Sequence, residues 1–149
     1  MVLEALASAV LAGAPTQPRV GAPIGVLVIP RLHLRAVVHQ GIAASVLAGG
    51  PGHYPGSALP GATGTVAVAG HRVTHTRPFL RITSLRKNDR IYFITPRHRF
   101  VYRVSAERIV PPRDIWVLRP ARRQRLVLTA CHPPRTAARR YVVFAVRVA

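Results

Sequence analysis

The stretch Arg90–Ala106, RIYFITPRHRFVYRVSA, decides the fold class of this chain. Apolar and polar side chains alternate through Arg90–Thr95 and again through Phe100–Ala106, which is the period of a β-strand with one buried face. Between them, Pro96–Arg99 has the composition of a turn. The stretch therefore predicts two strands joined by a turn.

Short apolar runs bounded by Pro and Gly recur on both sides of this pair. At 149 residues, nearly half of them hydrophobic, the chain can bury one core, and many short strands favour a single closed all-β barrel. Further strands are expected at Ile24–Ile29, Leu32–Val38, Thr65–Ala69, Gln124–Ala130 and Arg140–Val148, with Arg108–Val110 continuing the pairing. Short helical turns are expected at Ala44–Ala48, Pro78–Leu85 and Asp114–Leu118, and an ordered loop at Pro51–Gly56.

The N-terminal segment Met1–Pro15 is apolar but shorter than the roughly 20 residues that span a bilayer. Glu4 stands where a signal peptide carries positive charge. We expect an Ala-rich helix packed on the domain, with the frayed end of a membrane anchor as the alternative. Residues 16–23 have the Pro-rich composition of a linker. The chain is therefore divided into residues 1–23, an apolar helix and linker, and residues 24–149, a single folded domain.

The charge balance is strongly basic, with 22 Lys and Arg residues against four acidic ones and a net charge of +18. Such a surface attracts polyanions, so a basic nucleic-acid-binding barrel is one possible function. The aromatic residues are few and do not interleave with the basic ones as stacking platforms would require. The single cysteine excludes an internal disulfide, and so few carboxylates make a calcium site hard to build. We expect no metal and no cofactor.

Three residues have the chemistry of acyl transfer. His71 follows a strand end, Cys131 ends another strand, and Arg140 opens the last one. A thiol becomes a nucleophile as the thiolate, and a nearby imidazolium or guanidinium lowers a thiol pKa from about 8.5 to roughly 3.5–7.5. A fixed guanidinium donates hydrogen bonds to a carbonyl oxygen that gains negative charge. Cysteine, histidine and arginine thus suffice without a carboxylate.

From about Gly25 to its C-terminus, the sequence resembles the sortases, the transpeptidases that anchor surface proteins in Gram-positive bacteria. The resemblance is carried by motifs in the family's order: GPGHYPG at 50–56, AGH at 69–71, VP at 110–111 with Asp114 and VL at 117–118, and LTACHP at 128–133. The nine-residue step from Cys131 to Arg140 and the Arg-rich, Lys-poor composition are most similar to class E sortases of actinobacteria.

The resemblance implies an eight-stranded sortase barrel and a division of roles. Cys131 attacks the Thr–Gly carbonyl of a sorting signal, Leu-Ala-x-Thr-Gly or Leu-Pro-x-Thr-Gly, and forms a thioester. His71 moves the proton of the leaving and incoming amines, and Arg140 positions the substrate or stabilises the oxyanion. The implied partners are a surface protein with a C-terminal signal and the amine of a peptidoglycan precursor, on the outer face of the membrane. The implied substrate-binding residues are Tyr54, Thr129, Ala130 and His132.

These positions also allow alternative interpretations. A register slip of one residue would bring Arg139 in place of Arg140. His132 adjoins the cysteine and could compete with His71 as the base, although neighbours on an extended chain face apart. An alternative role for Tyr54 is to anchor its loop by packing. His71 and His75 lie four apart, a metal-ligand spacing only on a helix, which this segment does not resemble.

The chain departs from the family at two positions. The family usually reads Thr-Leu-x-Thr-Cys, whereas Val127 and Ala130 replace the two threonines here. The resemblance therefore implies that a site hydroxyl is missing, which leaves a catalytically weak, sortase-like peptide-binding module as a further alternative.

Overall fold

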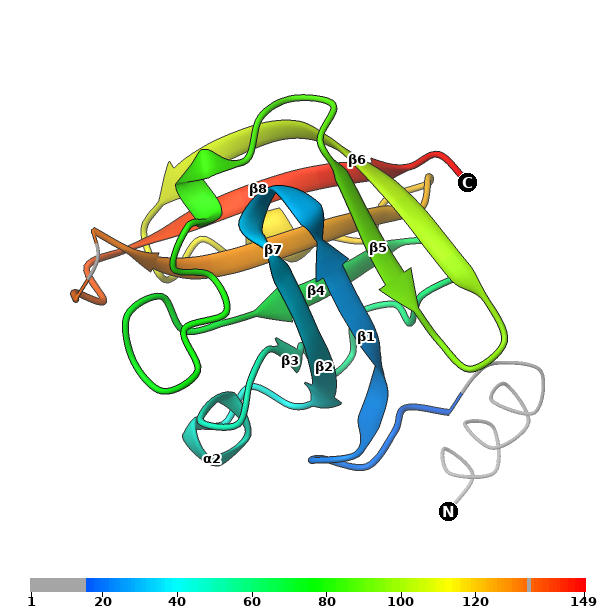
Figure 1. Cartoon of the computed structure of the whole chain (residues 1–149), viewed down its shortest axis with the longest axis horizontal. Helices are drawn as coiled ribbons and strands as arrows, with labels where there is room; N and C mark the ends of the chain where they lie inside the picture. The colour runs from blue at the N-terminus through cyan, green and yellow to red at the C-terminus, as the bar shows by residue number, and fades with distance from the viewer. Residues whose placement is uncertain (1–15, 134) are drawn as a thin grey trace, which may run out of the picture.

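The chain forms a closed β-barrel (Figure 1). A computed structural model describes residues 16–133 and 135–149; the helix expected over Met1–Pro15 lies outside them. Around the barrel the strands follow the order β1-β2-β3-β4-β7-β8-β6-β5, which confirms the predicted eight-stranded fold. Their bounds are β1 Pro23–Ile29, β2 Leu34–Gln40, β3 Gly52–His53, β4 Thr65–Ala69, β5 Arg90–Ile94, β6 Arg99–Val110, β7 Arg125–His132 and β8 Arg139–Arg147.

The pair predicted from Arg90–Ala106 is the antiparallel hairpin of β5 and β6, with Ile94 opposite Arg99. Its turn is closed by a 2.9 Å hydrogen bond from the Thr95 N–H to the His98 carbonyl. The expected continuation over 108–110 is part of β6, where it pairs with β8. Alternation therefore located this hairpin correctly, because one face of each strand packs in the barrel.

The segment Pro51–Gly56 was expected to be a loop, and that expectation is wrong for two of its residues. Gly52 and His53 form β3, which pairs in parallel with β2 and antiparallel with β4. A side chain at Gly52 would collide with the Gly41 carbonyl, so glycine is what allows the strands to approach here. Two residues are too few to show a period of two.

The start of β2 also differs slightly from the one expected. The strand expected from Leu32 begins at Leu34, because a 3-10 turn, η1 (Pro30–Leu32), precedes it and ends at His33 in the left-handed conformation. The three expected helical turns are present as short elements. They are α2 Ala44–Leu47, η2 Ile82–Ser84 and η3 Ile115–Leu118.

The core has two parts that lie on opposite faces of β7. Leu126, Leu128 and Ala130 belong to the large cluster that fills the barrel. Val127, on the other face, packs in a smaller cluster outside the barrel with residues of β6, β8 and η3: Val110, Val117, Val142 and Phe144. Since side chains alternate along a strand, Thr129 and Cys131 continue the outward row begun by Val127.

Among the described residues, no helix has the length and apolar character needed to cross a bilayer.

Candidate active site

Cys131 and Arg140 are direct cross-strand neighbours. In the antiparallel β7–β8 ladder Cys131 pairs with Arg140, and His132 pairs with Arg139. Directly opposed residues point to the same face of a sheet, with Cβ atoms about 4.5–5.5 Å apart. The Cys131 side chain is partly exposed rather than sealed in the interior. The register thus brings Arg140, and not Arg139, to the face that carries the thiol.

His71 reaches the same end of β7 from the neighbouring strand. β4 runs parallel to β7 with Ala69 opposite Thr129, and the Gly70 N–H donates a 3.1 Å hydrogen bond to the Thr129 carbonyl. His71 therefore follows β4 at the level where Cys131 continues β7. Its carbonyl accepts a 3.1 Å hydrogen bond from the Phe79 N–H, which ties the following loop back to this point.

Gly70 is required between the strand and His71 for a steric reason. A Cβ at this position would lie 2.6 Å from the ring of Phe79, a side chain that is fully buried in the barrel core. The ring therefore occupies the space that any larger residue would need. In the motif Ala-Gly-His, the glycine is therefore needed to make room for Phe79 beneath His71.

Arg72, the residue after His71, is buried and contacts the end of β7. Its Nη1 donates a 3.1 Å hydrogen bond to the Cys131 carbonyl and a 2.9 Å hydrogen bond to His132 Nδ1. Since an arginine only donates, His132 Nδ1 is the acceptor and the proton of the neutral ring lies on Nε2. The His132 ring also packs against Tyr141, with ring centroids 5.7 Å apart. Arg72 therefore links the loop that carries His71 to the strand end that carries Cys131.

A groove lies beside Thr129, on the outward face of β7. The hydroxyls of Tyr54 and Thr129 share a 2.7 Å hydrogen bond. Together with Arg140 and Asp114 they line a small pocket of about 100 Å³, and a second hollow of about 470 Å³ continues past Tyr54 and Leu118. Thr129 lies two residues before Cys131, so the groove opens on the same face of β7 that carries the thiol.

The other predicted site residues lie as follows. Ala130 is 3% exposed and packs inside the barrel, so the structure does not bring it to the groove. A threonine hydroxyl at that position would face the core and not the row of Thr129 and Cys131. Arg140 is partly exposed, and its Nη1 donates 3.2 Å hydrogen bonds to the Ala137 and Arg139 carbonyls.

The electrostatics of His71 favour its neutral form. Burial lowers its pKa from the usual 6.5, and the nearby His75 lowers it further. The two rings lie with centroids 4.9 Å apart. Within residues 16–133 and 135–149, no three or more His, Cys, Asp or Glu side chains gather as metal ligands. His71 is therefore placed for proton transfer, because a lowered pKa makes its protonated form a stronger acid.

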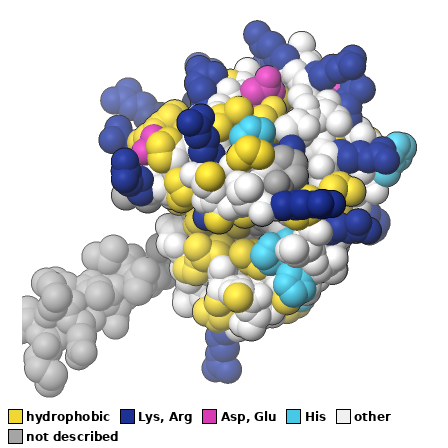
Figure 2. Space-filling view, turned by 90° about the vertical axis from the view of Figure 1, so that its left-hand side faces the viewer, with side chains coloured by type: hydrophobic (Ala, Val, Ile, Leu, Met, Phe, Trp, Pro, Cys, Tyr) yellow, Lys and Arg dark blue, Asp and Glu magenta, His cyan; other side chains and the backbone are white. Residues whose placement is uncertain are grey.

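Figure 2 shows the side of the molecule at which β7 ends and β8 begins. Dark-blue Arg and Lys side chains project over its upper half, with hydrophobic side chains between them. This face is therefore basic as well as grooved.

Two residues of this region were not among the candidates from the sequence. Arg72 appeared only as one of many arginines, and its burial depends on the packing of Tyr141 and β7 around it. His53 is fully buried next to Tyr54, where Nδ1 lies 2.6 Å from Gln40 Oε1 and Nε2 lies 2.8 Å from the Ala58 carbonyl. The signal for Arg72 was its place beside His71, and the signal for His53 was its place in the motif at 50–56 beside Tyr54.

Comparison with known proteins assigns this arrangement to a family. The model of the sortase domain matches residues 27–148, nearly the whole chain. The chain belongs to the sortase family. It is a sortase-family transpeptidase, and the family as a whole acts on proteins with sorting signals and on cell-wall precursors. Sortases are generally associated with the cell envelope of Gram-positive bacteria.

Two curated sortases and two solved structures illustrate the similarity. Sortase D of Bacillus subtilis is 30% identical over 136 residues, which cover 89% of this chain and 67% of that protein. Sortase SrtE1 of Streptomyces coelicolor is 32% identical over 142 residues, and the chain spans only 40% of its length while 83% of the chain is matched.

The structure of sortase E from Streptomyces avermitilis superposes with a TM-score of 0.80 at 31% identity, covering 89% of this chain and 91% of that one. The SrtA sortase from Actinomyces oris superposes with a TM-score of 0.82 at 28% identity, covering 91% and 87%. The sortase barrel is therefore shared along almost all of this chain.

Proposed function

We propose that this sortase cleaves a sorting signal between Thr and Gly through a thioester on Cys131 and transfers the acyl group to an amine. One observation carries the proposal: the β7–β8 register puts Arg140 on the thiol's face, and the adjacent β4 delivers His71 to the same strand end. A nucleophile, a proton carrier and a cationic hydrogen-bond donor thus share one side of the barrel.

The reaction proceeds in two balanced halves. The Cys131 thiolate attacks the threonine carbonyl carbon, a C–S bond forms, and the C–N bond to glycine breaks. The leaving nitrogen takes its proton from the His71 imidazolium. In the second half an amine attacks the thioester, gives a proton to neutral His71, and forms a new amide as the C–S bond breaks. The lowered pKa of His71 favours proton donation in the first half.

Arg140 is proposed to stabilise the oxyanion of both tetrahedral intermediates. Its present hydrogen bonds to the Ala137 and Arg139 carbonyls are long and have neutral acceptors. An oxyanion is a stronger acceptor, since charge-assisted hydrogen bonds are roughly twice as strong as neutral ones. The guanidinium can therefore exchange these contacts for the developing charge.

The groove is proposed to bind the signal ahead of the scissile bond. Tyr54 and Thr129 line it, and His132 borders the thiol, whereas Ala130 acts only through the packing of β7. We favour Leu-Ala-x-Thr-Gly over Leu-Pro-x-Thr-Gly, because the nine-residue step from Cys131 to Arg140 is similar to class E sortases and the matched relatives include a sortase E. The acceptor is proposed to be the amine of a peptidoglycan precursor on the outer face of the membrane.

Intact-mass spectrometry of the protein with a Leu-Ala-x-Thr-Gly peptide tests the function. The mass should rise by the acyl fragment, and an added amine should discharge it. Cys131→Ala should show no adduct. Arg140→Lys should slow adduct formation by about 10²–10³-fold, as expected for loss of an oxyanion donor.

The neighbouring substitution Arg139→Lys is the matched control, because it makes the same chemical change on the opposite face of β8. It should leave the rate within about threefold of wild type. If wild type forms no adduct with the alanine or the proline signal, the transpeptidase proposal fails and the peptide-binding alternative gains.

A further inference from the structure

We infer that the end of the barrel remote from Cys131 holds a binding site for phosphate groups. A pocket of about 600 Å³ lies there. Four arginines and no acidic side chain line it: Arg103, Arg122, Arg123 and Arg147. The remaining lining includes Thr63 and Gln124, which add hydrogen-bonding groups.

This pocket is separate from the active site. Gln124 directly precedes β7 and Arg147 ends β8, whereas Cys131 lies near the other end of the same two-stranded ribbon. Cys131 lies seven residues after Gln124 along this extended segment, or about 23 Å away. In Figure 1 the C-terminus and the turn between β7 and β8 accordingly lie on opposite sides of the barrel.

Two of the four guanidinium groups are held in place by side-chain amides. Arg103 Nη1 donates a 2.6 Å hydrogen bond to Asn88 Oδ1, and Arg147 Nη1 donates one of 2.6 Å to Gln124 Oε1. The Arg147 guanidinium also lies 4.9 Å from the centroid of the Phe100 ring. An amide oxygen fixes the side chain without cancelling its charge, so most N–H donors stay available for an anion.

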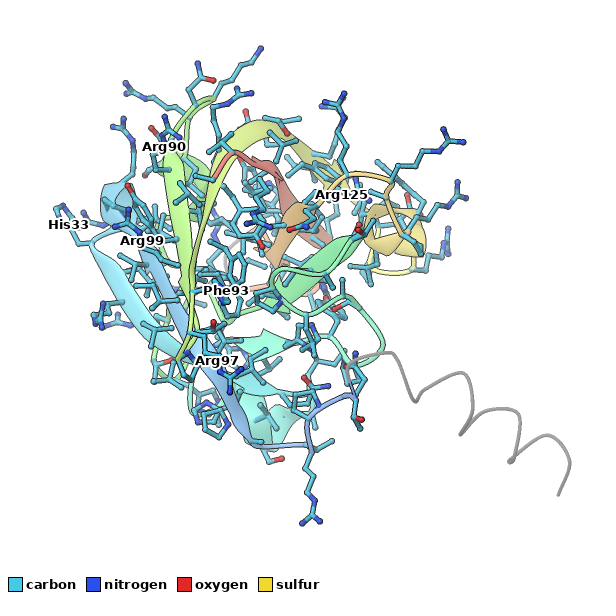
Figure 3. The ribbon with its side chains drawn as sticks, turned by 90° about the vertical axis from the view of Figure 1, so that its right-hand side faces the viewer. His33, Arg90, Phe93, Arg97, Arg99 and Arg125 are labelled. Atoms are coloured by element: carbon cyan, nitrogen blue, oxygen red, sulfur yellow. The ribbon has the colours of Figure 1, made fainter. Side chains whose placement is uncertain are left out.

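None of the described side chains that line the pocket carries a negative charge. Arg103 stands directly opposite Arg90 in the β5–β6 ladder, an arrangement of like charges that destabilises a sheet. Asp89, the acidic residue next to Asn88, is already paired with Arg31 at 2.7 Å. Figure 3 faces this end of the barrel, and the labelled Arg90 and Arg99 belong to its β5–β6 side. A bound anion would relieve this repulsion.

Phosphate is the anion that fits this set of donors. The planar guanidinium matches two phosphate oxygens at once, and four such groups around one pocket suit an anion with several charges better than a single carboxylate. We therefore assign the pocket to a chain or cluster of phosphate groups. A soluble or polymeric oligophosphate and a lipid headgroup share this chemistry, and the experiment separates them.

Calorimetric titration with inorganic tripolyphosphate at fixed ionic strength tests the site. Wild type should bind with a saturable one-to-one curve. The triple variant R103Q/R122Q/R123Q should bind at least about tenfold more weakly, since it removes three guanidinium groups that donate charge-assisted hydrogen bonds. Arg147 is left unchanged, because it packs on Phe100.

The control variant R19Q/R35Q/R81Q removes the same three charges from exposed positions outside the pocket. It should weaken binding by less than about threefold, as expected of unspecific long-range attraction alone. Equal weakening in the two triple variants would overturn the inference, because the anion would then respond to net charge and not to the pocket. Circular dichroism melting checks that both variants fold.

Co-sedimentation with phosphatidylglycerol vesicles, against phosphatidylcholine vesicles, distinguishes the source of the phosphate. Vesicle binding that is lost in the pocket variant and kept in the control assigns a lipid headgroup. Tripolyphosphate binding without vesicle binding assigns a soluble or polymeric oligophosphate. Absence of both, or no difference between the variants, rejects the site. Cys131→Ala should bind tripolyphosphate normally, so this result does not depend on the transpeptidase proposal.

Discussion

Removing the hydroxyl of Tyr54 is expected to destabilise the protein by about 1–3 kcal/mol, the penalty for a buried polar group without a partner. The Tyr54 oxygen lies 2.7 Å from Thr129 Oγ1, and Thr129 is only 4% exposed. In Tyr54→Phe the threonine hydroxyl stays buried but loses the group that offsets its desolvation. The loss of stability therefore arises from the unpartnered Thr129 hydroxyl and not from the mutated ring.

The opposite substitution should be milder. Thr129→Val keeps the shape of the side chain and leaves the Tyr54 hydroxyl, whose ring is only half-buried and can turn that oxygen toward water. We expect a loss below about 1 kcal/mol. The double variant removes both groups, so its cost should be smaller than the sum, with an interaction energy of about 0.5–1.5 kcal/mol.

Urea unfolding followed by circular dichroism measures the four free energies of this cycle. The matched control is Tyr92→Phe, because Tyr92 is also half-buried but its ring is engaged by Arg99 instead of through a hydroxyl hydrogen bond. That control should change the free energy by less than about 0.5 kcal/mol. The reasoning is refuted if Tyr54→Phe costs no more than Tyr92→Phe, or if the two single effects simply add.

Three further outcomes follow from the geometry around the site. Arg72→Met should lower the free energy of unfolding by about 1–3 kcal/mol, because two hydrogen bonds from the charged guanidinium are lost. The control Arg77→Met changes an exposed arginine and should lower it by less than about 0.5 kcal/mol in the same urea titration. Gly70→Ala should cost about 1–3 kcal/mol from overpacking against Phe79, and Phe79→Leu should recover part of this loss when combined with it. Burial lowers the pKa of His53 below 6.5 in the folded state, so the unfolded chain binds the extra proton on acidification. The free energy of unfolding should therefore fall as the pH drops from about 6.5 through the folded pKa, with a slope of at most about 1.4 kcal/mol per pH unit for this group. His53→Gln should flatten this slope. An unchanged slope in the variant would contradict the assignment to His53.

The hairpin β5–β6 and the strands β7 and β8 could be predicted from the sequence alone. Their side chains alternate or form apolar runs between Pro and Gly, and that pattern reflects burial in any fold. The candidates Cys131, His71 and Arg140 were also visible, because each stands at the end of such a run and within a motif of the family. Local pattern and chemical type were enough for these positions.

The sequence did not show which side chains of β7 point into the barrel. Its central residues are buried on both sides, so the run from Leu126 to Ala130 shows no alternation that tells inside from outside. Ala130 was expected at the substrate from the family motif next to the cysteine, although it packs in the barrel. The two-residue strand β3 escaped prediction because its pairing depends on the approach of β2 and β4 and not on any property of Gly52 and His53.

The sequence by itself determined that this chain is an all-β domain with a cysteine, a histidine and an arginine at strand ends. Only the tertiary structure decided that Arg140 faces Cys131, that Arg72 is buried against its carbonyl, and that four arginines meet at the far end of the barrel. The physical reason is that a period of two fixes which residues share a face of one strand. Which strands become neighbours, and in which register, depends on closing the whole barrel.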